Sequence, residues 1–159
     1  MSALRFVALA TETVRALQSG AADATGQAPE RQVSDGPGIP CRHCLSDVAA
    51  GEPYLVLAHR PFPEVQPYAE VGPIFLHAAD CARYAESAEV PAMLLTRART
   101  LIRGYGRDDR IVYGTGQVVA SAAIAETARA LLERPEIAYL HLRSASNNCY
   151  QCRIERGLG

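Results

Sequence analysis

The stretch from Ile137 to Arg156 reads IAYLHLRSASNNCYQCRIER and shows the folding pattern of this chain most clearly. Its outer parts, 137–143 and 150–156, carry the aromatic and β-branched residues that strands favour. The turn SASNN joins them, and Ser and Asn are common in turns because their side chains bond to the local backbone. The sequence therefore predicts two neighbouring antiparallel strands here.

The same pattern extends toward the N-terminus. Residues 54–59 (YLVLAH) and 71–76 (VGPIFL) are short apolar runs bounded by Pro or Gly, so both are predicted strands. Residues 100–119 hold two further apolar runs around the turn-rich sequence RGYGRDDR, which indicates a β-hairpin. Because strands outnumber helices and follow one another, we expect an α+β fold, with a mostly antiparallel sheet and two or three helices packed against it.

Two segments have the apolar spacing of amphipathic helices. The first ends before Gly20, a helix-stop signal, and Thr11 is its predicted N-cap. The second begins with Ser121 as its predicted cap and ends before Pro135. The apolar residues at helical spacing are Ala10, Val14 and Leu17 in the first segment, and Ile124, Ala128, Leu131 and Leu132 in the second.

The length of 159 residues matches one domain of ordinary size that can bury its own core. We expect a single domain over 1–159, divided into an N-terminal helical segment at 1–19, a connector at 20–40 and an α+β body at 41–159. The connector lacks any periodic pattern and is rich in Gly, Ala, Asp, Gln and Pro. The body begins with a loop that is similar to a zinc knuckle.

Charge and hydropathy argue against two classes of partner. With 16 basic and 17 acidic residues the net charge is -1, which offers no attraction to nucleic acid or to an anionic membrane. The first apolar run is interrupted at Thr11 and is too short for a signal-peptide core or a membrane span. We therefore expect a cytoplasmic protein whose partner is a small molecule or another protein. The sequence leaves the oligomeric state open.

The spacing of cysteine and histidine gives the strongest chemical signal. Cys41 and Cys44 form a CxxC pair, and two thiolates at this spacing can bind one tetrahedral zinc ion from a tight turn. His77 and Cys81 follow the strand predicted at 71–76, and a helix beginning there would place both side chains on one face. Three thiolates and one imidazole would then form a structural zinc site with no open position for water.

A second CxxC pair, Cys149 and Cys152, competes for the same role, because with the first pair it would make a site of four thiolates. In a regular strand over 149–156 the two thiols would face opposite sides, and Cys152 would share its face with Tyr150 as a small buried residue. Cys149 could instead be exposed and reactive, or lie beside Cys41. A disulfide between the two segments remains open for an oxidising compartment.

His141 and Arg143 are two positions apart and share one face of the strand predicted at 137–143. With Cys149 they could line a pocket for an anion or carboxylate, since Arg presents a planar fork of donors. The alternative is an ordinary solvated sheet face. We expect any ligand site to lie where this strand and the SASNN turn meet the CRHC loop. The candidate ligand-binding residues are Arg42, Arg103, His141, Arg143 and Asn147.

Two further histidines have ordinary interpretations. His43 lies between two predicted metal ligands and is expected to face solvent. His59 precedes the Pro-rich loop PFPEVQPY, which could frame a site but is more often a rigid connector.

Three functions remain open, and the sequence does not decide whether the protein is an enzyme. The favoured one is a binding or regulatory domain stapled by zinc, with a small anionic ligand. The second is a small enzyme in which Cys149 is the nucleophile and His141 the base. The third is a thiol oxidoreductase at Cys41 and Cys44, because CxxC is also the spacing of redox pairs.

Five motifs occur in a fixed order: GIPCRHCL, GEPYLVLAHRPF, PYAEVGPIFLHAADCARY, LIRGY and YLHLRSASNNCYQCRIER. From about Gly38 to Arg156 this series resembles the bacterial domain of unknown function 1203 family, and the resemblance assigns no reaction. Many relatives have PCR followed by a hydrophobic residue and Ser, without a ligand matching Cys44. The resemblance therefore implies that zinc is a structural staple in a subset of the family. Cys152 also departs from the family's closing pattern.

Overall fold

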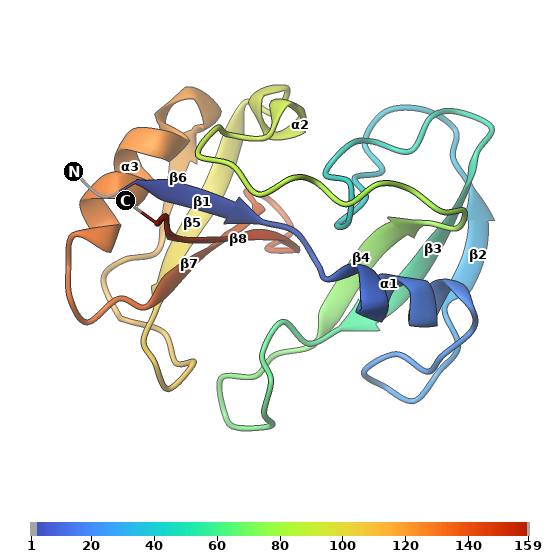
Figure 1. Cartoon of the computed structure of the whole chain (residues 1–159), viewed down its shortest axis with the longest axis horizontal. Coiled ribbons are helices and arrows are strands. Elements are labelled where there is room, and N and C mark those ends of the chain that lie inside the picture. Colours follow the sequence, from blue (N-terminus) through green and yellow to red (C-terminus); the bar gives the residue numbers. More distant parts are fainter. Residues whose placement is uncertain (1–2, 159) are drawn as a thin grey trace.

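A computed structural model describes residues 3–158, which form two antiparallel sheets and three α-helices (Figure 1). The five-stranded sheet has the order β1 (Leu4–Val7), β8 (Tyr150–Arg156), β7 (Tyr139–Ser144), β5 (Arg99–Tyr105) and β6 (Gln117–Ala120). The three-stranded sheet has the order β2 (Glu30–Val33), β3 (Pro53–His59) and β4 (Gly72–His77). The predicted α+β class is confirmed, but the strands divide between two sheets instead of forming one.

Strands β7 and β8 form the antiparallel pair predicted around SASNN. Leu140 pairs with Ile154 and Leu142 with Cys152, and all four side chains belong to one apolar core. Helix α3 (Ile124–Leu132) covers this face of the five-stranded sheet and contributes its own apolar side to the same core. We call this cluster the main core. Leu140 and Leu142 alternate along β7 and both enter the main core, while the residues of the opposite face of β7 are buried as well.

The pairing of β7 and β8 contains a β-bulge. Leu142 pairs with Cys152 but Arg143 pairs with Tyr150, so Gln151 is an extra residue on β8. Because a bulge reverses the alternation on one side of it, Tyr150 does not share a face with Cys152. Cys152 packs in the main core, as expected for a small buried residue, whereas Tyr150 packs with the other sheet. The predicted common face of these two residues is wrong.

The helices agree with the sequence in position but not in their caps. Helix α1 (Thr11–Gln18) is followed by Gly20 at φ +96°, as the stop signal predicts. Thr11 is the first helical residue and makes no capping bond, since its hydroxyl contacts a histidine. Ser121 begins a 3₁₀ turn, and its hydroxyl bonds to Thr100. A short helix α2 (Ala92–Leu95) is additional. No helix within residues 3–158 has both the length and the apolar character that a membrane crossing requires.

The three-stranded sheet contains the predicted strands as β3 and β4, packed against α1. Val14 and Leu17 of α1 meet Leu57 of β3 in a separate cluster, which we call the second core. Its third strand, β2, lies inside the segment at 20–40 that was predicted to be a connector without a periodic pattern. All four β2 residues are exposed, so the strand has no apolar alternation that could reveal it. Strand β1 likewise lies in the segment predicted to be helical.

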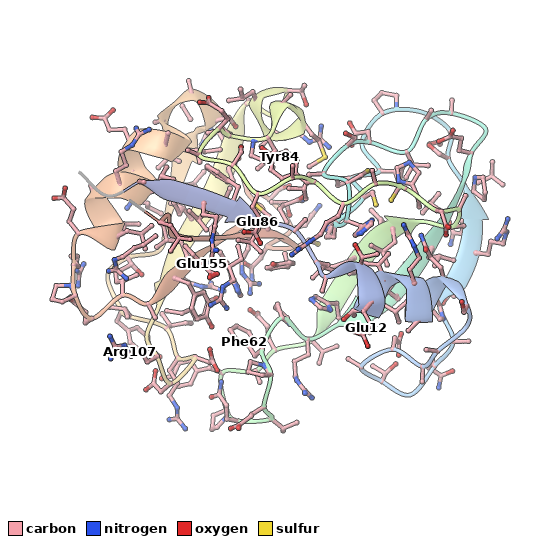
Figure 2. The ribbon with its side chains drawn as sticks, viewed as in Figure 1. Glu12, Phe62, Tyr84, Glu86, Arg107 and Glu155 are labelled. Atoms are coloured by element: carbon pink, nitrogen blue, oxygen red, sulfur yellow. The ribbon has the colours of Figure 1, made fainter. Side chains whose placement is uncertain are left out.

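Contacts from loops join the two sheets (Figure 1). Leu45, from the loop after β2, is buried in the main core, although Cys41 of the same loop belongs to the second core. Arg42 donates from Nε to the carbonyl of Tyr150 at 2.7 Å. Phe62 lies on the loop between β3 and β4 (Figure 2), and its ring centroid is 5.3 Å from that of Tyr105 on the five-stranded sheet. These contacts position the residues of the candidate site.

Candidate metal centre and adjoining pocket

The CRHC loop is a tight turn held by its own backbone. The N–H of Leu45 donates to the carbonyl of Cys41 at 3.0 Å, and the N–H of Cys41 donates to the carbonyl of Ser46 at 3.0 Å. Leu45 has a φ of +54°, in the left-handed region that few non-glycine residues adopt. Its burial in the main core accounts for a Leu at this place. The loop therefore presents Cys41 and Cys44 from a fixed turn.

The second half of the cluster comes from the end of β4. His77 is the last residue of that strand, and Cys81 follows in an extended segment without helical structure. The helix considered for the HxxxC spacing does not form. Helix α1 holds this segment instead, because Gln18 donates to the carbonyl of His77 at 2.9 Å and Arg15 donates to that of Cys81 at 2.8 Å. A turn of the chain, not a helix face, brings the two side chains together.

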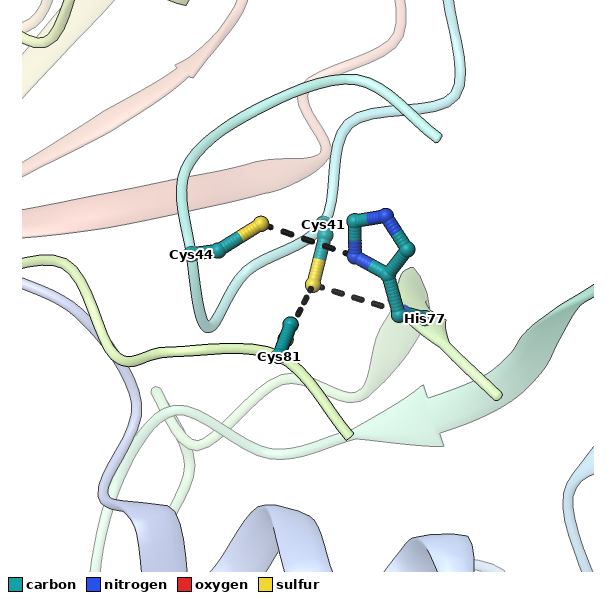
Figure 3. Close-up of side chains that lie close together, drawn as sticks. All are labelled: Cys41, Cys44, His77 and Cys81. Atoms are coloured by element: carbon teal, nitrogen blue, oxygen red, sulfur yellow. Dashed lines mark hydrogen bonds between the residues drawn. The ribbon is translucent and has the colours of Figure 1, made fainter. Parts of the chain in front are cut away.

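The four predicted metal ligands form one cluster (Figure 3). One ligand atom from each of Cys41, Cys44, His77 and Cys81 lies within 4.8 Å of all the others. The Sγ atoms of Cys41 and Cys81 are 3.9 Å apart, and Sγ of Cys44 is 3.5 Å from Nδ1 of His77. A tetrahedral zinc ion with ordinary bond lengths would separate two sulfurs by about 3.8 Å and a sulfur from a nitrogen by about 3.6 Å. The composition of the cluster and these two separations are therefore compatible with a tetrahedral metal site.

The electrostatics of the cluster favour one thiolate. A hydrogen bond from Cys44 and backbone N–H groups of the same loop lower the pKa of Cys41 to about 4, although burial acts against this shift. The same hydrogen bond raises the pKa of Cys44. Burial and the neighbouring charge of Cys41 raise the pKa of Cys81 to about 11. Metal binding would therefore displace protons from Cys44 and Cys81, as it does at thiolate sites generally.

Outer contacts orient two of the ligands. Nε2 of His77 is 3.7 Å from a carboxylate oxygen of Glu52, which leaves Nδ1 directed at the cluster. Nδ1 of His43 is 3.1 Å from Sγ of Cys81, and its Nε2 is 2.9 Å from the hydroxyl of Thr11. His43 is fully buried beneath α1, so its expected exposure to solvent is wrong. The sequence offered no signal for Glu52, which precedes β3 on another turn.

The second CxxC pair is not part of this cluster. Cys152 is fully buried in the main core, where burial raises its pKa to about 12. Cys149 lies in the turn before β8 and its thiol is 3.8 Å from the carbonyl of Asn147. All five cysteines are free. The alternative of four thiolates would require moving Cys152 out of an apolar core, so the arrangement favours the set with His77.

A pocket of about 240 Å³ lies where the two sheets meet. From the five-stranded sheet it is lined by the predicted residues Arg143, Asn147 and Cys149. From the three-stranded side the lining is His59, Pro61, Glu70, Val71, Gly72 and Pro73. The SASNN turn therefore meets the ends of β3 and β4 and their connecting loop, whereas the CRHC loop contributes no lining residue. Glu70 was not predicted, and its place at the end of the Pro-rich loop is the one available signal.

Arg143 and His141 are both buried beside this pocket. Arg143 donates from Nη1 to the carbonyl of Asn148 at 3.2 Å and from Nη2 to Nδ1 of His141 at 3.0 Å. Nη2 of Arg143 also contacts a carboxylate oxygen of Glu70 at 2.5 Å. Burial among aromatic rings and the nearby guanidinium of Arg143 hold the pKa of His141 well below its usual value. These two residues do not form the solvated sheet face considered as an alternative.

The remaining predicted residues lie outside the pocket lining. Arg42 is buried, and its Nη1 donates to the carbonyl of Pro40 at 2.6 Å in addition to its bond to β8, so it braces the loop. Arg103 donates from Nε to the hydroxyl of Tyr105 at 2.8 Å and reaches Glu70 at 3.4 Å. Nδ1 of His141 is occupied by a guanidinium and its Nε2 has no hydrogen-bond partner among the described residues. His141 therefore does not contact Cys149 as a base would.

Comparison with known proteins gives one match. No curated protein and no solved structure matches the chain. The model of a family described as "Protein of unknown function (DUF1203)" matches residues 38–156. This range contains all four cluster residues and the whole lining of the pocket. The chain therefore belongs to the DUF1203 family.

Proposed function

We propose that this chain is a binding domain stapled by a structural zinc ion, which Cys41, Cys44, His77 and Cys81 hold. The observation that carries the proposal is the agreement between the ligand-atom separations of 3.9 and 3.5 Å and those of a tetrahedral zinc site. Four protein ligands fill a tetrahedron and leave no position for water, so the ion would be structural and not catalytic. The free cysteine thiols of the chain support a reducing compartment such as the cytoplasm.

The staple would act at the junction of the two sheets. Cys41 lies in the second core and Leu45 of the same loop in the main core, so zinc would fix the loop that enters both. The pocket beside His59 and Gly72, at the other end of the β3–β4 pair from His77, would be the binding site. Arg143 lines the pocket and is almost fully buried, and its guanidinium is a cationic fork of donors, which supports a small anionic ligand.

A thiol oxidoreductase is the second candidate, and the low pKa of Cys41 is the observation that favours it. The same pKa also suits a zinc ligand. What supports zinc is that His77 and Cys81 complete the set, since a redox pair needs neither. Metal content distinguishes the two functions.

The test is elemental analysis of protein purified without added metal. We expect about one equivalent of zinc, and we expect Cys44→Ser and Cys81→Ser to lose it because each removes one of four ligands. Cys149→Ser and Cys152→Ser are the matched controls outside the cluster and should retain the metal. A reduced, folded sample with almost no metal would falsify the zinc site, and His77→Ala with unchanged affinity would show that the ligand set is wrong.

The pocket is tested by titrating the ¹⁵N-labelled protein with inorganic phosphate and with acetate. Binding of either should shift the amide signals of Gly72, Asn147 and Cys149, which line the pocket. Arg143→Lys keeps the positive charge but loses the planar fork, so it should weaken binding. Arg107→Lys, at an exposed position, should not. Shifts spread evenly over the surface would contradict a site in this pocket.

A further inference from the structure

Glu70 places a carboxylate on the cation of the pocket. Its Oε1 atom contacts Nη2 of Arg143 at 2.5 Å and Nη2 of Arg103 at 3.4 Å. The side chain of Arg143 is 3% exposed, whereas that of Glu70 is 41% exposed. One partner of this ion pair is thus fixed inside the protein, and the other reaches it from a surface loop.

Arg143 needs an anion because a buried guanidinium without a counter-charge is strongly unfavourable. Its Nη1 and Nη2 atoms have partners, but its Nε atom is buried without a hydrogen-bond partner among the described residues. Nε2 of His59, which also lines the pocket, is buried without one. Two residues that line the pocket therefore each carry a buried nitrogen atom whose hydrogen-bonding capacity Glu70 leaves unused.

We propose that Glu70 stands in for the carboxylate of a ligand, and that the pocket binds small monocarboxylates, which displace Glu70 from Arg143. The proposal rests on the proposed binding function and names its ligand class. On displacement the ligand carboxylate accepts from the fork of Arg143, and Glu70 keeps Arg103 as its partner. No covalent bond is made or broken. Binding exchanges the carboxylate of Glu70 for that of the ligand in the ion pair with Arg143.

Charge selects a singly charged ligand. Arg143 is the one arginine in the pocket lining and Glu70 the one carboxylate. Burial and the neighbouring arginines lower the pKa of His59 to about 4, so this imidazole is neutral near pH 7. Once Glu70 has left, the lining offers a single positive charge. A dianion would keep one charge unpaired in a partly enclosed site, which costs free energy.

Size and polarity select a short ligand. The volume of about 240 Å³ lies below the range of pockets for drug-sized molecules, which is roughly 300–1,000 Å³. Pro61, Val71 and Pro73 give one wall an apolar character that suits a short alkyl chain. Asn147 adds a polar group on the opposite side. Propionate combines these features and is the probe for the test.

The experiment measures the Kd of propionate by NMR titration of zinc-loaded protein. Glu70→Gln removes the competing carboxylate, and the apparent Kd should fall because the free fraction of Arg143 rises. If the Glu70–Arg143 ion pair contributes about 1.4 kcal/mol, its removal should lower the Kd of propionate about tenfold. Glu64→Gln, on the same loop at an exposed position, is the matched control and should leave the Kd unchanged. Propionamide, which lacks the charge, should not bind.

Several outcomes separate this inference from the proposed function. If Glu70→Gln leaves the Kd unchanged or raises it while Arg143→Lys still weakens binding, the pocket is a ligand site but Glu70 is no competitor, and the inference is overturned. If phosphate binds and propionate does not, the ligand class is wrong. If neither binds to wild type or Glu70→Gln, the pocket assignment fails while zinc content still tests the staple. Should Glu70→Gln fail to fold, Glu70→Asp, shorter by one methylene, must also lower the Kd.

Discussion

The five-stranded sheet packs on the larger apolar core, whereas the three-stranded sheet borders a cluster of residues that could bind a metal. In the main core, Leu142 of β7 and Ile124 of α3 are fully buried and pack directly together with their neighbours. The second core is smaller, and one edge of its sheet is the fully exposed strand β2. The difference teaches where a metal is useful, because a sheet with a small apolar core gains most from an additional link.

If the cluster holds zinc as proposed, the largest expected effect is that of removing the ion. A strong chelator should abolish hydrogen-exchange protection in β3 and β4 while β7 and β8 retain theirs. The reason is the size of the apparent binding free energy, about 10–16 kcal/mol in zinc-finger peptides, against a net stability of about 5–15 kcal/mol for an ordinary domain. Equal loss of protection in both sheets would show that they unfold as one unit, and unchanged protection would show that the metal is no staple.

A substitution in the main core should lower the stability of the protein without releasing the metal. Leu142→Ala is expected to lower the free energy of unfolding by about 2–5 kcal/mol, since it leaves a cavity in the main core. Zinc stoichiometry should not change. Urea denaturation measures the stability, and Leu158→Ala is the control because Leu158 is 92% exposed. Loss of zinc from Leu142→Ala would mean that the metal site depends on the main core and is not independent of it.

A smaller effect, on zinc affinity, is expected from replacing His43, which contacts one of the proposed ligands. His43→Phe keeps the ring but removes the N–H that faces Sγ of Cys81, so zinc affinity should fall about 10–100-fold, as for other outer contacts of zinc sites. His43→Asn offers a donor near the former Nδ1 position and should recover part of the affinity. Competition with a chelating dye measures both. Equal affinities of His43→Phe and wild type would assign His43 to packing alone.

The smallest expected effect concerns a salt bridge that joins the two halves. Arg97 holds both carboxylate oxygens of Asp47, at 2.8 and 3.2 Å, and so links the CRHC loop to the segment after α2. Asp47→Asn should lower the free energy of unfolding by less than about 1 kcal/mol, because both side chains are partly exposed. The loss should shrink at high salt. Thermal unfolding measures this loss, and Asp35→Asn, at an exposed position, is the control. Equal shifts of the melting temperature in the two variants would show that this salt bridge does not help to join the two halves.

The sequence was sufficient to group the four residues that could hold a metal, because ligand spacing is a property of local chemistry. It predicted that His77 and Cys81 belong together, although for a helical reason that the structure replaces with a turn under α1. Strand β2 could not be found because each of its residues is exposed and pairing alone defines it. The bulge at Gln151 depends on its partner strand, so the face of Tyr150 could not be read from β8.

The lining of the pocket could also be predicted only in part from the sequence. Arg143, Asn147 and Cys149 were predicted because they are close in sequence. Glu70 enters from a loop more than seventy residues earlier in the chain, and no local pattern links an acid there to an arginine on β7. Arg42 looked like a binding residue because arginines usually are exposed, but its bonds to backbone carbonyls make it structural.

The pairing of Leu4 with Arg156 has a consequence for how the protein is made. During synthesis β1 emerges from the ribosome before the metal-cluster residues, whereas its partner strand β8 emerges after them. The four metal-cluster residues, by contrast, all lie between positions 41 and 81. The proposed zinc ion could therefore be captured before β8 has been synthesised, and closure of the five-stranded sheet would follow.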